Sequence, residues 1–582
     1  MSRPPSKDSL ALTRMRLLIL VTIMRRATIT LLLAILPLTL LNLARADQLS
    51  RADKLRSLYS NQFAFDSRGI PIVTVAIADG LREAVIESDA PPRLLPNGEA
   101  GSEVTAGRRW QVTIKRGSRP ARARYFAILA RHPYGGLAPM REDLGRWQAR
   151  GLKPEIMEVG TVFGVKGKVF DSRAFLLVSG PHRHRAAAVG ISEGQAVIHG
   201  LARPSAVAKL ERRPSGSFQA VALDNAQAPT ARATVTIKDV LWFAPAPGKK
   251  ITVSFNDPAR SNARVTKPYW GEVYAAVDRE GRMALVNAVP ADRLLAGLVP
   301  AEIFPSAPEA ALRAQAVAAR GQLLAKIGTR HLEDPYLLCS SVHCQVYAGA
   351  GQEHPRTTAA VEATRGQLLV RKEGGLVDTV YSAVCGGHTE HNDNVWPTPP
   401  DSNLRGHLDA PSDEASLAPF RHGISEANLD KWLTLQPATW CARSKYNKDK
   451  VRWTVRLSSA RMDRLTASLG VGSVRSIRVL DRGISARARA VLVEGAKGKH
   501  TVKGELTIRR QFGNLRSSMF SVRAEAGAGG GASPAAFIFT GGGWGHGVGM
   551  CQTGSTGMGA AGKSHQQILQ HYYPGSQLKN LY

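Results

Sequence analysis

The sequence predicts an α+β protein, in which a β-rich amino-terminal region is followed by a mixed α+β domain. Short apolar runs with β-branched residues dominate residues 64–241. The clearest helical periodicity comes later, at residues 308–327. Strand-like runs return after that helix, at residues 368–384, 451–457 and 474–480. We therefore expect two folded regions, at residues 47–248 and 249–582.

In the first region, strand-like runs surround one helix. Alternating segments with β-branched residues predict strands at residues 70–75, 110–114 and 233–237. Residues 140–151 (MREDLGRWQARG) have helical spacing and stand between apolar runs at 125–129 and 174–178. This strand, helix, strand order loosely resembles a SPOR domain, a small glycan-binding module. An ordinary α+β packing domain is the alternative.

The second region begins with a hairpin. Residues 269–273 and 283–287 have the pattern of strands, and the Asp-Arg-Glu-Gly sequence at 278–281 predicts the turn between them. The helix at 308–327 starts with Pro-Glu, which suits a first helical turn. A short helix near the carboxyl terminus is expected to be capped by Ser564, with Gln567 at the capping-box position.

Composition and charge narrow the class of protein. The 582 residues are 43% hydrophobic and 21% charged, which is typical of a globular protein and excludes disorder over most of the chain. The formal net charge of +31 favours an anionic partner, such as nucleic acid, acidic lipid or a carboxylate-bearing polysaccharide. Five cysteines in so long a chain exclude a scaffold held by disulfides, and their odd number leaves at least one thiol outside any intrachain pairing.

The first 46 residues have the features of a signal peptide. Arg25 and Arg26 precede an apolar run at residues 27–43, and Ala-Arg-Ala closes it at Ala46. Cleavage after Ala46 and retention as a membrane anchor both fit this pattern. We expect an exported protein of the periplasm or cell envelope, which excludes nucleic acid as a partner. Contact with a membrane is expected only through this segment, if it stays uncleaved.

Four segments of the second half occur together. They are residues 298–305 (LVPAEIFP) with the Ala-rich helix after them, 344–349 (CQVYAG), 381–389 (YSAVCGGHT) and 543–552 (GWGHGVGMCQ). This set resembles the stage II sporulation protein D family of peptidoglycan-acting proteins, whose domain also occurs in amidase-enhancer proteins. The resemblance spans about residues 268–582.

The resemblance implies lytic transglycosylase activity, which cleaves the bond between MurNAc and GlcNAc, preferably in glycan strands stripped of their stem peptides. Glu302 matches the catalytic glutamate of the family. One carboxyl group is sufficient here, because the muramic C6 hydroxyl attacks internally and leaves a 1,6-anhydro end, whereas ordinary glycosidases need two. Apolar neighbours of Glu302 are expected to raise its pKa. The alternative for Glu302 is a carboxylate that complements the dipole of a helix N-terminus.

A second function fits the same resemblance. The protein would then be a non-catalytic amidase enhancer, which binds peptidoglycan and positions a separate cell-wall amidase. Denuded glycan strands are the expected binding partner in both cases.

Substrate-binding residues are expected around a glycine-rich loop at residues 541–549. Its glycines let the backbone approach a ligand, Trp544 offers a face for stacking on a sugar, and His546 offers a hydrogen bond or a proton. A tight structural turn is the alternative. By analogy with the family we add Gln552, which ends this motif. The analogy also assigns the opposite wall of a cleft to Tyr381, Ser382, Gly386 and Gly387.

Arg320 lies at the edge of the apolar face of the Ala-rich helix. Its guanidinium group is expected to hold a carboxylate, which belongs either to the glycan or to the protein itself.

A cluster of metal-ligating residue types falls within fourteen residues. It comprises His331, Cys339, His343 and Cys344, a set able to complete a tetrahedral zinc shell. Some members of the family bind zinc through Cys and His near this point. A second candidate set comprises Cys385, His388 and His391, whereas Cys441 has the features of a core residue. Disulfides between Cys339 and Cys344 or between Cys344 and Cys385, and free thiols, are the alternatives to zinc, and no other cofactor is expected.

Overall fold

The structure is a computed structural model that describes part of the chain. It covers Lys54 and residues 58–582, except for residues 61, 63, 97–103, 106, 134–135, 166–167, 200–204, 225–232, 342, 373, 397, 436–437 and 528–533. The segment expected to be a signal peptide, residues 1–46, lies outside the described residues. Among the described helices, none is long and apolar enough to cross a membrane.

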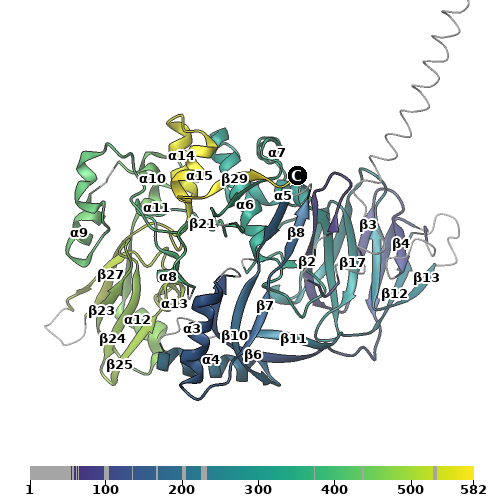
Figure 1. The fold of residues 1–582 in the computed structure, drawn as a ribbon, viewed down its shortest axis with the longest axis horizontal. Coiled ribbons are helices and arrows are strands. Elements are labelled where there is room, and N and C mark those ends of the chain that lie inside the picture. The colour runs from purple at the N-terminus through teal and green to yellow at the C-terminus, as the bar shows by residue number, and fades with distance from the viewer. Residues whose placement is uncertain are drawn as a thin grey trace, which may run out of the picture.

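Two β-sheets pack against each other at one end of the molecule (Figure 1). The first has the order β1 (Ala64–Phe65), β2 (Pro71–Leu81), β18 (Met283–Pro290), β17 (Glu272–Val277), β14 (Val240–Ala244) and β4 (Arg93–Pro96), with β19 (Leu338–Cys339) beside β2. The second has the order β13 (Thr234–Lys238), β12 (Ser217–Ala222), β5 (Arg109–Ile114), β3 (Glu83–Ser88), β15 (Ile251–Asp257) and β16 (Ala263–Tyr269). Alternate residues of both sheets meet in one buried core, among them Val75, Trp110 and Phe218.

Both sheets contain strands from each side of residue 248, where the sequence predicted a domain boundary. β14 pairs with β17, and β15 pairs with β3. The expected hairpin is confirmed in β17 and β18, but the strand predicted at 269–273 is interrupted. Gly271 has a φ of 77° there, and a side chain at that position would collide with the carbonyl of Ala288.

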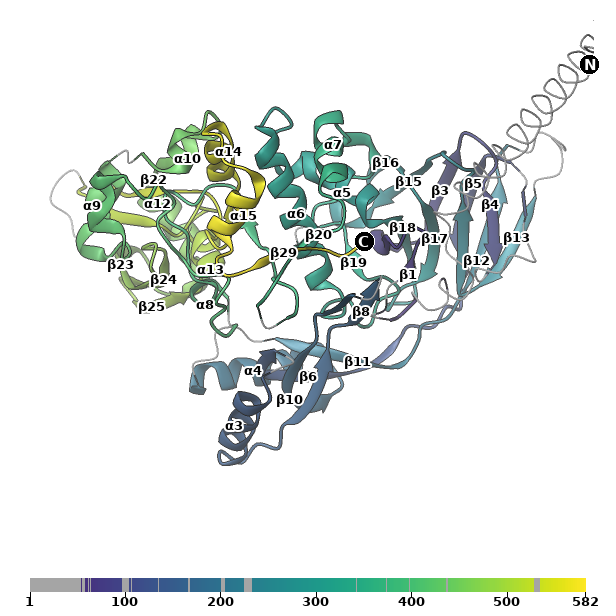
Figure 2. The same ribbon diagram turned by 45° about the horizontal axis from the view of Figure 1, so that its top comes forward.

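A small α+β module is inserted between β5 and β12 (Figure 2). Its elements are β6 (Arg122–Pro133), α3 (Leu137–Gln148), β7 (Glu155–Val159), β8 (Val162–Val165), β9 (Lys168–Asp171), β10 (Ala174–His182), α4 (Arg185–His199) and β11 (Ala206–Arg212). The antiparallel sheet has the order β11-β6-β10-β7, which is the arrangement of a ferredoxin-like βαββαβ unit. The predicted strand, helix, strand order is therefore present, while glycan binding by this module stays a prediction.

Three helices connect the sheets to the rest of the chain: α5 (Ala291–Glu302), α6 (Glu309–Lys326) and α7 (Pro355–Ala363). The prediction of a helix at 308–327 is confirmed by α6, whose caps are Pro308 and Ile327. Small side chains let neighbours approach α6 closely, so that most of its residues are buried. The sequence did not reveal α5, because Gly297 and Pro300 lie inside it and both weaken a helical pattern.

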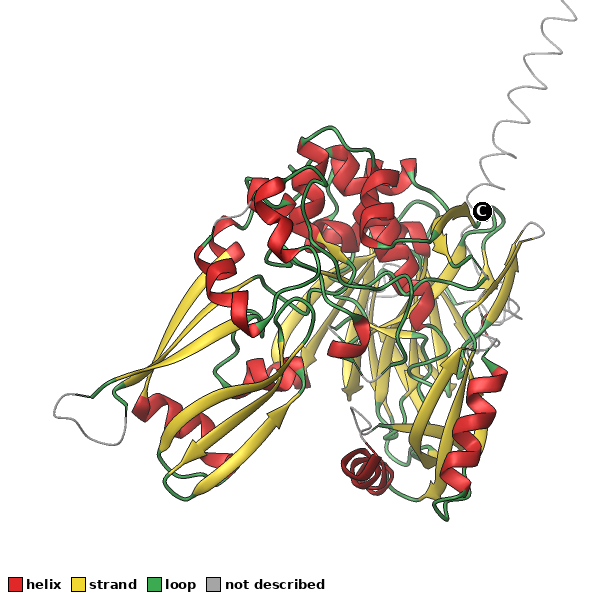
Figure 3. Ribbon diagram, turned by 60° about the vertical axis from the view of Figure 1, so that its left-hand side comes forward, coloured by secondary structure: helices red, strands yellow, loops and turns green. Residues whose placement is uncertain are grey.

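The carboxyl-terminal lobe combines small sheets with short helices (Figure 3). One sheet has the order β22 (Arg452–Ser458), β27 (Ala536–Gly542) and β26 (Phe520–Glu525), and another the order β23 (Val474–Arg482), β24 (Ala488–Gly495) and β25 (Gly498–Lys503). Two short pairs are β20 (Gln367–Val370) with β29 (Gln577–Asn580) and β21 (Tyr381–Ser382) with β28 (Met550–Cys551). The helices are α8 (Asn392–Val395), α9 (Glu426–Thr434), α10 (Trp440–Arg443), α11 (Lys448–Val451), α12 (Ser459–Thr466), α13 (Glu505–Gln511), α14 (Gln552–Ala560) and α15 (His565–Tyr572). The expected capping box of Ser564 and Gln567 is present at α15.

Candidate functional site

Glu302 is the last residue of α5, where the chain leaves the helix. Ile303 follows in an extended conformation and donates its N–H to the carbonyl of Val299 at 3.1 Å. The negative end of the helix dipole therefore lies at this carboxylate, and α6 begins only at Glu309. The interpretation of Glu302 as a group that complements a helix N-terminus is wrong.

Three polar groups act on the Glu302 side chain. Nε2 of Gln552 donates to the backbone carbonyl of Glu302 at 2.8 Å and lies 3.5 Å from its Oε2. The Tyr381 hydroxyl hydrogen-bonds the carboxylate, and the Lys326 ammonium adds a favourable charge. Burial raises the pKa of Glu302, these three groups lower it, and the net shift is upward. The carboxyl group thus keeps its proton to a higher pH than an ordinary glutamate.

A partly buried hydrogen-bond chain leads away from the Tyr381 hydroxyl. Nε2 of Gln345 donates to the Tyr381 hydroxyl at 3.4 Å and to Oε1 of Gln322 at 2.8 Å. Burial raises the pKa of Tyr381 far above its usual value, so the hydroxyl keeps the proton that it shares with Glu302. The sequence analysis placed Gln345 in a motif but gave this residue no role, because its contact with α6 is visible only in the fold.

The two glycine-containing motifs pair with each other. Tyr381 and Ser382 in β21 run parallel to Met550 and Cys551 in β28. Farther along, Trp544 and Val384 exchange two backbone hydrogen bonds of 2.8 and 3.0 Å. The two segments therefore lie side by side, and the prediction that they form opposite walls of a cleft is wrong.

Arg320 was expected to hold a carboxylate of the glycan or of the protein, and the structure favours the second alternative over a role in binding substrate. Its side chain has no exposed surface. Nη1 donates to the carbonyl of Thr364 at 2.9 Å, and Nη2 lies 3.2 Å from Oδ1 of Asp292. The carboxylate that it holds therefore belongs to the protein.

Gly386 and Gly387 are buried rather than open to a ligand. A Cβ on Gly387 would lie 2.7 Å from the Trp432 ring, and one on Gly386 would lie 2.9 Å from the backbone of Gly542. These glycines let protein segments pack together. They were predicted to contact the substrate, but in the structure their role is in packing. Ser382 is also buried, and its hydroxyl has no hydrogen-bond partner among the described residues.

Trp544 and His546 differ in exposure. The Trp544 side chain is 40% exposed, and the Lys450 ammonium lies 4.6 Å from its ring centroid. His546 packs against Trp396 with ring centroids 4.8 Å apart, and its Nδ1 accepts from the N–H of Val548. Burial lowers the pKa of His546 to about 3, so the ring is neutral near pH 7 and offers a hydrogen bond rather than a proton.

A second aromatic surface follows Glu302 directly. Phe304 is 49% exposed and stacks on Tyr446, with ring centroids 5.0 Å apart. The sequence treated Phe304 only as an apolar neighbour of Glu302 and gave no role to Tyr446, which comes from a segment more than a hundred residues away. Together with Trp544, these rings offer flat faces of the kind that stack on sugar rings.

The predicted Cys/His cluster is assembled. The ligand atoms of His331, Cys339, His343 and Cys344 all lie within 4.8 Å of one another. Nε2 of His331 is 3.3 Å from Sγ of Cys344, and Nδ1 of His343 is 3.6 Å from each sulfur. This Cys₂His₂ set fits one tetrahedral ion.

The other predicted pairings of this region are absent. None of the five cysteines is in a disulfide, and Cys385 belongs to a different cluster from Cys344. The set of Cys385, His388 and His391 is not formed either, because the ligand atoms of the two histidines do not gather around Cys385.

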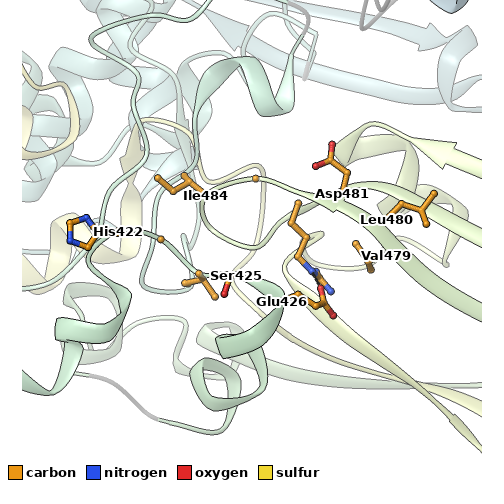
Figure 4. A pocket seen from close by; sticks show the side chains of 11 residues that line it. His422, Ser425, Glu426, Val479, Leu480, Asp481 and Ile484 are labelled. Carbon is orange, nitrogen blue, oxygen red and sulfur yellow. Dashed lines mark hydrogen bonds and ion pairs between the residues drawn. The ribbon is translucent and has the colours of Figure 1, made fainter.

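A separate pocket opens between the start of α9 and the end of β23 (Figure 4). It is lined by residues 422–426 and 479–484 and contains none of the predicted site residues. Its carboxylates are paired, since Glu426 contacts Arg482 and Asp481 lies 3.4 Å from Arg489. We therefore centre the candidate site on Glu302.

Comparison with known proteins relates this part of the chain to a known family. Residues 279–370, which include Glu302, match the stage II sporulation protein family. The chain contains a domain of the stage II sporulation protein D family. Residues 390–549 match a domain of unknown function, which contributes Trp544 and His546 beside the family domain.

Two curated relatives match about half of the chain. A protein of Brachyspira hyodysenteriae that is described as uncharacterized is 27% identical over 297 residues, which are 50% of this chain and 67% of the relative. The amidase enhancer of Bacillus subtilis is 26% identical over 309 residues, which are 49% of this chain but only 40% of that protein.

Proposed function

We propose that this protein is an exported peptidoglycan lytic transglycosylase with Glu302 as its only acid and base, acting in the periplasm or cell envelope. The observation that carries the proposal is the setting of Glu302. Its carboxyl group lies at the negative end of α5, is partly buried, and has a raised pKa. These are the properties of a general acid that must be protonated near neutral pH.

The polar partners of Glu302 support a mechanism with one carboxyl group. They are Gln552, Tyr381 and Lys326, none of which carries a carboxylate. In the proposed reaction Glu302 gives its proton to the glycosidic oxygen, and the bond to MurNAc C1 breaks. The Glu302 carboxylate then takes the proton of the MurNAc C6 hydroxyl, whose oxygen bonds to C1. No water is consumed, and a 1,6-anhydro end forms.

The side chains of the candidate site suit a denuded glycan strand. Removing the stem peptide frees the lactyl carboxylate of MurNAc, which places regular negative charges along the strand. Lys450 beside Trp544 supplies a cation next to a stacking face, and the net charge of +31 attracts such a strand at longer range.

The Cys₂His₂ cluster is the proposed zinc site. A zinc ion with four protein ligands and no open position stabilises structure and takes no part in catalysis. Cys344 precedes Gln345, whose side chain reaches the Tyr381 hydroxyl, so an ion here would hold that part of the site in place.

An amidase enhancer is the second candidate function. It is favoured by the similarity to the amidase enhancer of Bacillus subtilis, which extends over 49% of this chain. In that case the protein binds peptidoglycan and positions a separate amidase.

Purified protein incubated with denuded glycan strands distinguishes the two functions. The transglycosylase proposal predicts anhydro-muramoyl products, found by mass spectrometry, without any added amidase. Binding to the strands with no cleavage product would contradict that proposal and favour the enhancer.

A further inference from the structure

A second cluster of ligand-type side chains lies in the carboxyl-terminal lobe. It consists of three cysteines and one aspartate: Cys385, Cys441, Cys551 and Asp409. Their ligand atoms lie within 4.8 Å of one another, and all four residues are buried. The four residues come from separate segments between positions 385 and 551, so local spacing does not reveal them.

The backbone holds these segments in register. The N–H of Asp409 donates to the carbonyl of Gly387 at 2.9 Å, and the N–H of Trp440 donates to the carbonyl of Asp409 at 2.8 Å. Cys551 is joined to the same unit, because its Sγ accepts from the N–H of Cys385 at 3.2 Å. The cluster is therefore formed by the fold itself.

The spacing of the ligand atoms suits one small tetrahedral ion. Sγ of Cys385 is 3.9 Å from Sγ of Cys441 and 3.0 Å from Oδ2 of Asp409. With zinc–sulfur bonds of about 2.3 Å, two sulfurs of a tetrahedral site lie about 3.8 Å apart. A disulfide needs a sulfur separation of about 2.05 Å, and pairing two of three cysteines would leave the third thiol and a buried carboxylate without a function.

The surroundings resemble the outer shell of a metal–thiolate site. Oδ1 of Asp409 accepts from the Tyr572 hydroxyl at 2.8 Å and lies 3.1 Å from Nε2 of His571, which leaves Oδ2 pointing at the sulfurs. Backbone N–H groups donate to two of the sulfurs, that of Gly387 to Cys385 at 3.3 Å and that of Gly554 to Cys551 at 3.2 Å. Such contacts fix ligand orientation and stabilise thiolate charge.

Two further features favour an anionic ligand set. The Arg452 and Arg487 guanidinium groups interact electrostatically with the cysteines, and Nη2 of Arg487 donates to the carbonyl of Cys385 at 3.1 Å. Gly554 leaves the space beside the carboxylate open, because a Cβ there would lie 2.6 Å from Oδ2 of Asp409.

We propose that Cys385, Cys441, Cys551 and Asp409 bind a divalent zinc-type cation at a structural site separate from the Cys₂His₂ cluster. Binding displaces the thiol protons of the cysteines, and the ion takes the place of the hydrogen bond between Cys385 and Asp409. Three soft sulfurs and one oxygen in a tetrahedral arrangement select zinc over magnesium or calcium.

The position of the site gives it a consequence for Glu302. Cys551 directly precedes Gln552, and Cys385 follows the strand that carries Tyr381. An ion that joins Cys385 to Cys551 fixes β21 against β28 and therefore the two side chains that contact Glu302. Metal binding itself does not depend on the proposed catalytic function.

The full-length protein, prepared under reducing conditions, tests the inference by its metal content. The variant in which Cys339 and Cys344 are both changed to Ser lacks the first cluster and should retain about one equivalent of zinc. Adding Cys441→Ser to that variant should reduce the zinc to none. Cobalt exchanged into the first variant should give strong sulfur-to-cobalt absorption. A folded double variant without zinc would overturn the proposal.

Because Cys441 is buried, a second measurement avoids substituting it. Anomalous diffraction at the zinc edge, collected on crystals of the unaltered protein, should show a peak between Cys385, Cys441, Cys551 and Asp409. Ordered side chains with no anomalous peak, or a disulfide between any two of these cysteines, would overturn the proposal.

Discussion

The Gln552 side chain bridges α14 and α5 by donating a 2.8 Å hydrogen bond from Nε2 to the backbone carbonyl of Glu302. The same nitrogen lies 3.5 Å from Oε2 of Glu302 and 3.3 Å from Oε1 of Gln315. Gln552 therefore fixes the backbone at the end of α5 as well as the carboxylate.

Replacing Gln552 with Ala should lower kcat for glycan cleavage about 100-fold with a small change in KM. The reason is that Glu302 loses its orientation, whereas the contacts of the substrate are retained. Steady-state kinetics on denuded strands measures this. Gln567→Ala is the matched control, since it removes only a capping interaction of α15 and should cost about 1 kcal/mol of stability without changing kcat. Equal kcat values for Gln552→Ala and the wild type would refute the positioning role.

The raised pKa of Glu302 predicts two pH effects. Activity should persist above the ordinary pKa of glutamate, about 4.3, and fall only where the buried carboxyl group ionises. The folded state binds this proton more tightly than the unfolded state does. The contribution of Glu302 to stability is therefore lost as pH rises from the pKa of the unfolded state through the higher pKa of the folded state.

Glu302→Gln separates the two effects. The variant should lack this pH dependence of stability and be at least as stable as the wild type near pH 7. Thermal unfolding of both proteins at several pH values provides the measurement, with the exposed Glu309→Gln as control. Identical stability profiles for Glu302→Gln and the wild type would contradict the raised pKa.

Trp544→Ala should weaken binding of denuded glycan about tenfold, since stacking on an aromatic face contributes about 0.5–1.5 kcal/mol. Higher salt should weaken binding further, because it screens partly exposed charges such as Lys450. Calorimetry with native and amidase-treated glycans at two salt concentrations tests this. Leu480→Ala, which also replaces an exposed apolar side chain, is the control, and this variant should bind glycan as tightly as the wild type does. Equal affinity for the two glycans at both salts would contradict the preference for denuded strands.

The Cys₂His₂ cluster predicts that a chelator lowers the thermal stability of the protein, because metal binding to the folded state contributes to folding. His343→Ala should remove about one equivalent of zinc from the full-length chain. His422→Ala changes a histidine that belongs to neither cluster and should leave the metal content unaltered. Unchanged zinc in His343→Ala would place the metal elsewhere.

The sequence predicted elements whose patterns are local. The hairpin of β17 and β18 and the helix α6 follow from alternating or helical spacing with clear turn residues. The assembly of the Cys₂His₂ cluster was also predictable, since its residues are close in sequence. Glu302 was singled out by the resemblance to a family and not by its spacing. The helix α5 was missed because Gly297 and Pro300 obscure its periodicity.

The remaining parts of the site depend on contacts between distant segments. Asp409 and Cys441 join Cys385 only after the lobe has folded, and no spacing rule connects them. The sequence left open whether Arg320 holds a carboxylate of the glycan or of the protein, because its position on the helix does not show that Asp292 lies beside its guanidinium group. The pairing of β21 with β28 likewise brings two motifs side by side. The sequence showed only the order of these motifs along the chain.

The mass of the product formed in ¹⁸O-labelled water tests the central claim most directly. If Glu302 acts as the only acid and base, cleavage of denuded glycan by the wild type gives 1,6-anhydro ends that contain no ¹⁸O, and Glu302→Gln gives no product. Incorporation of ¹⁸O into the new ends, or cleavage by Glu302→Gln at the wild-type rate, would contradict the account.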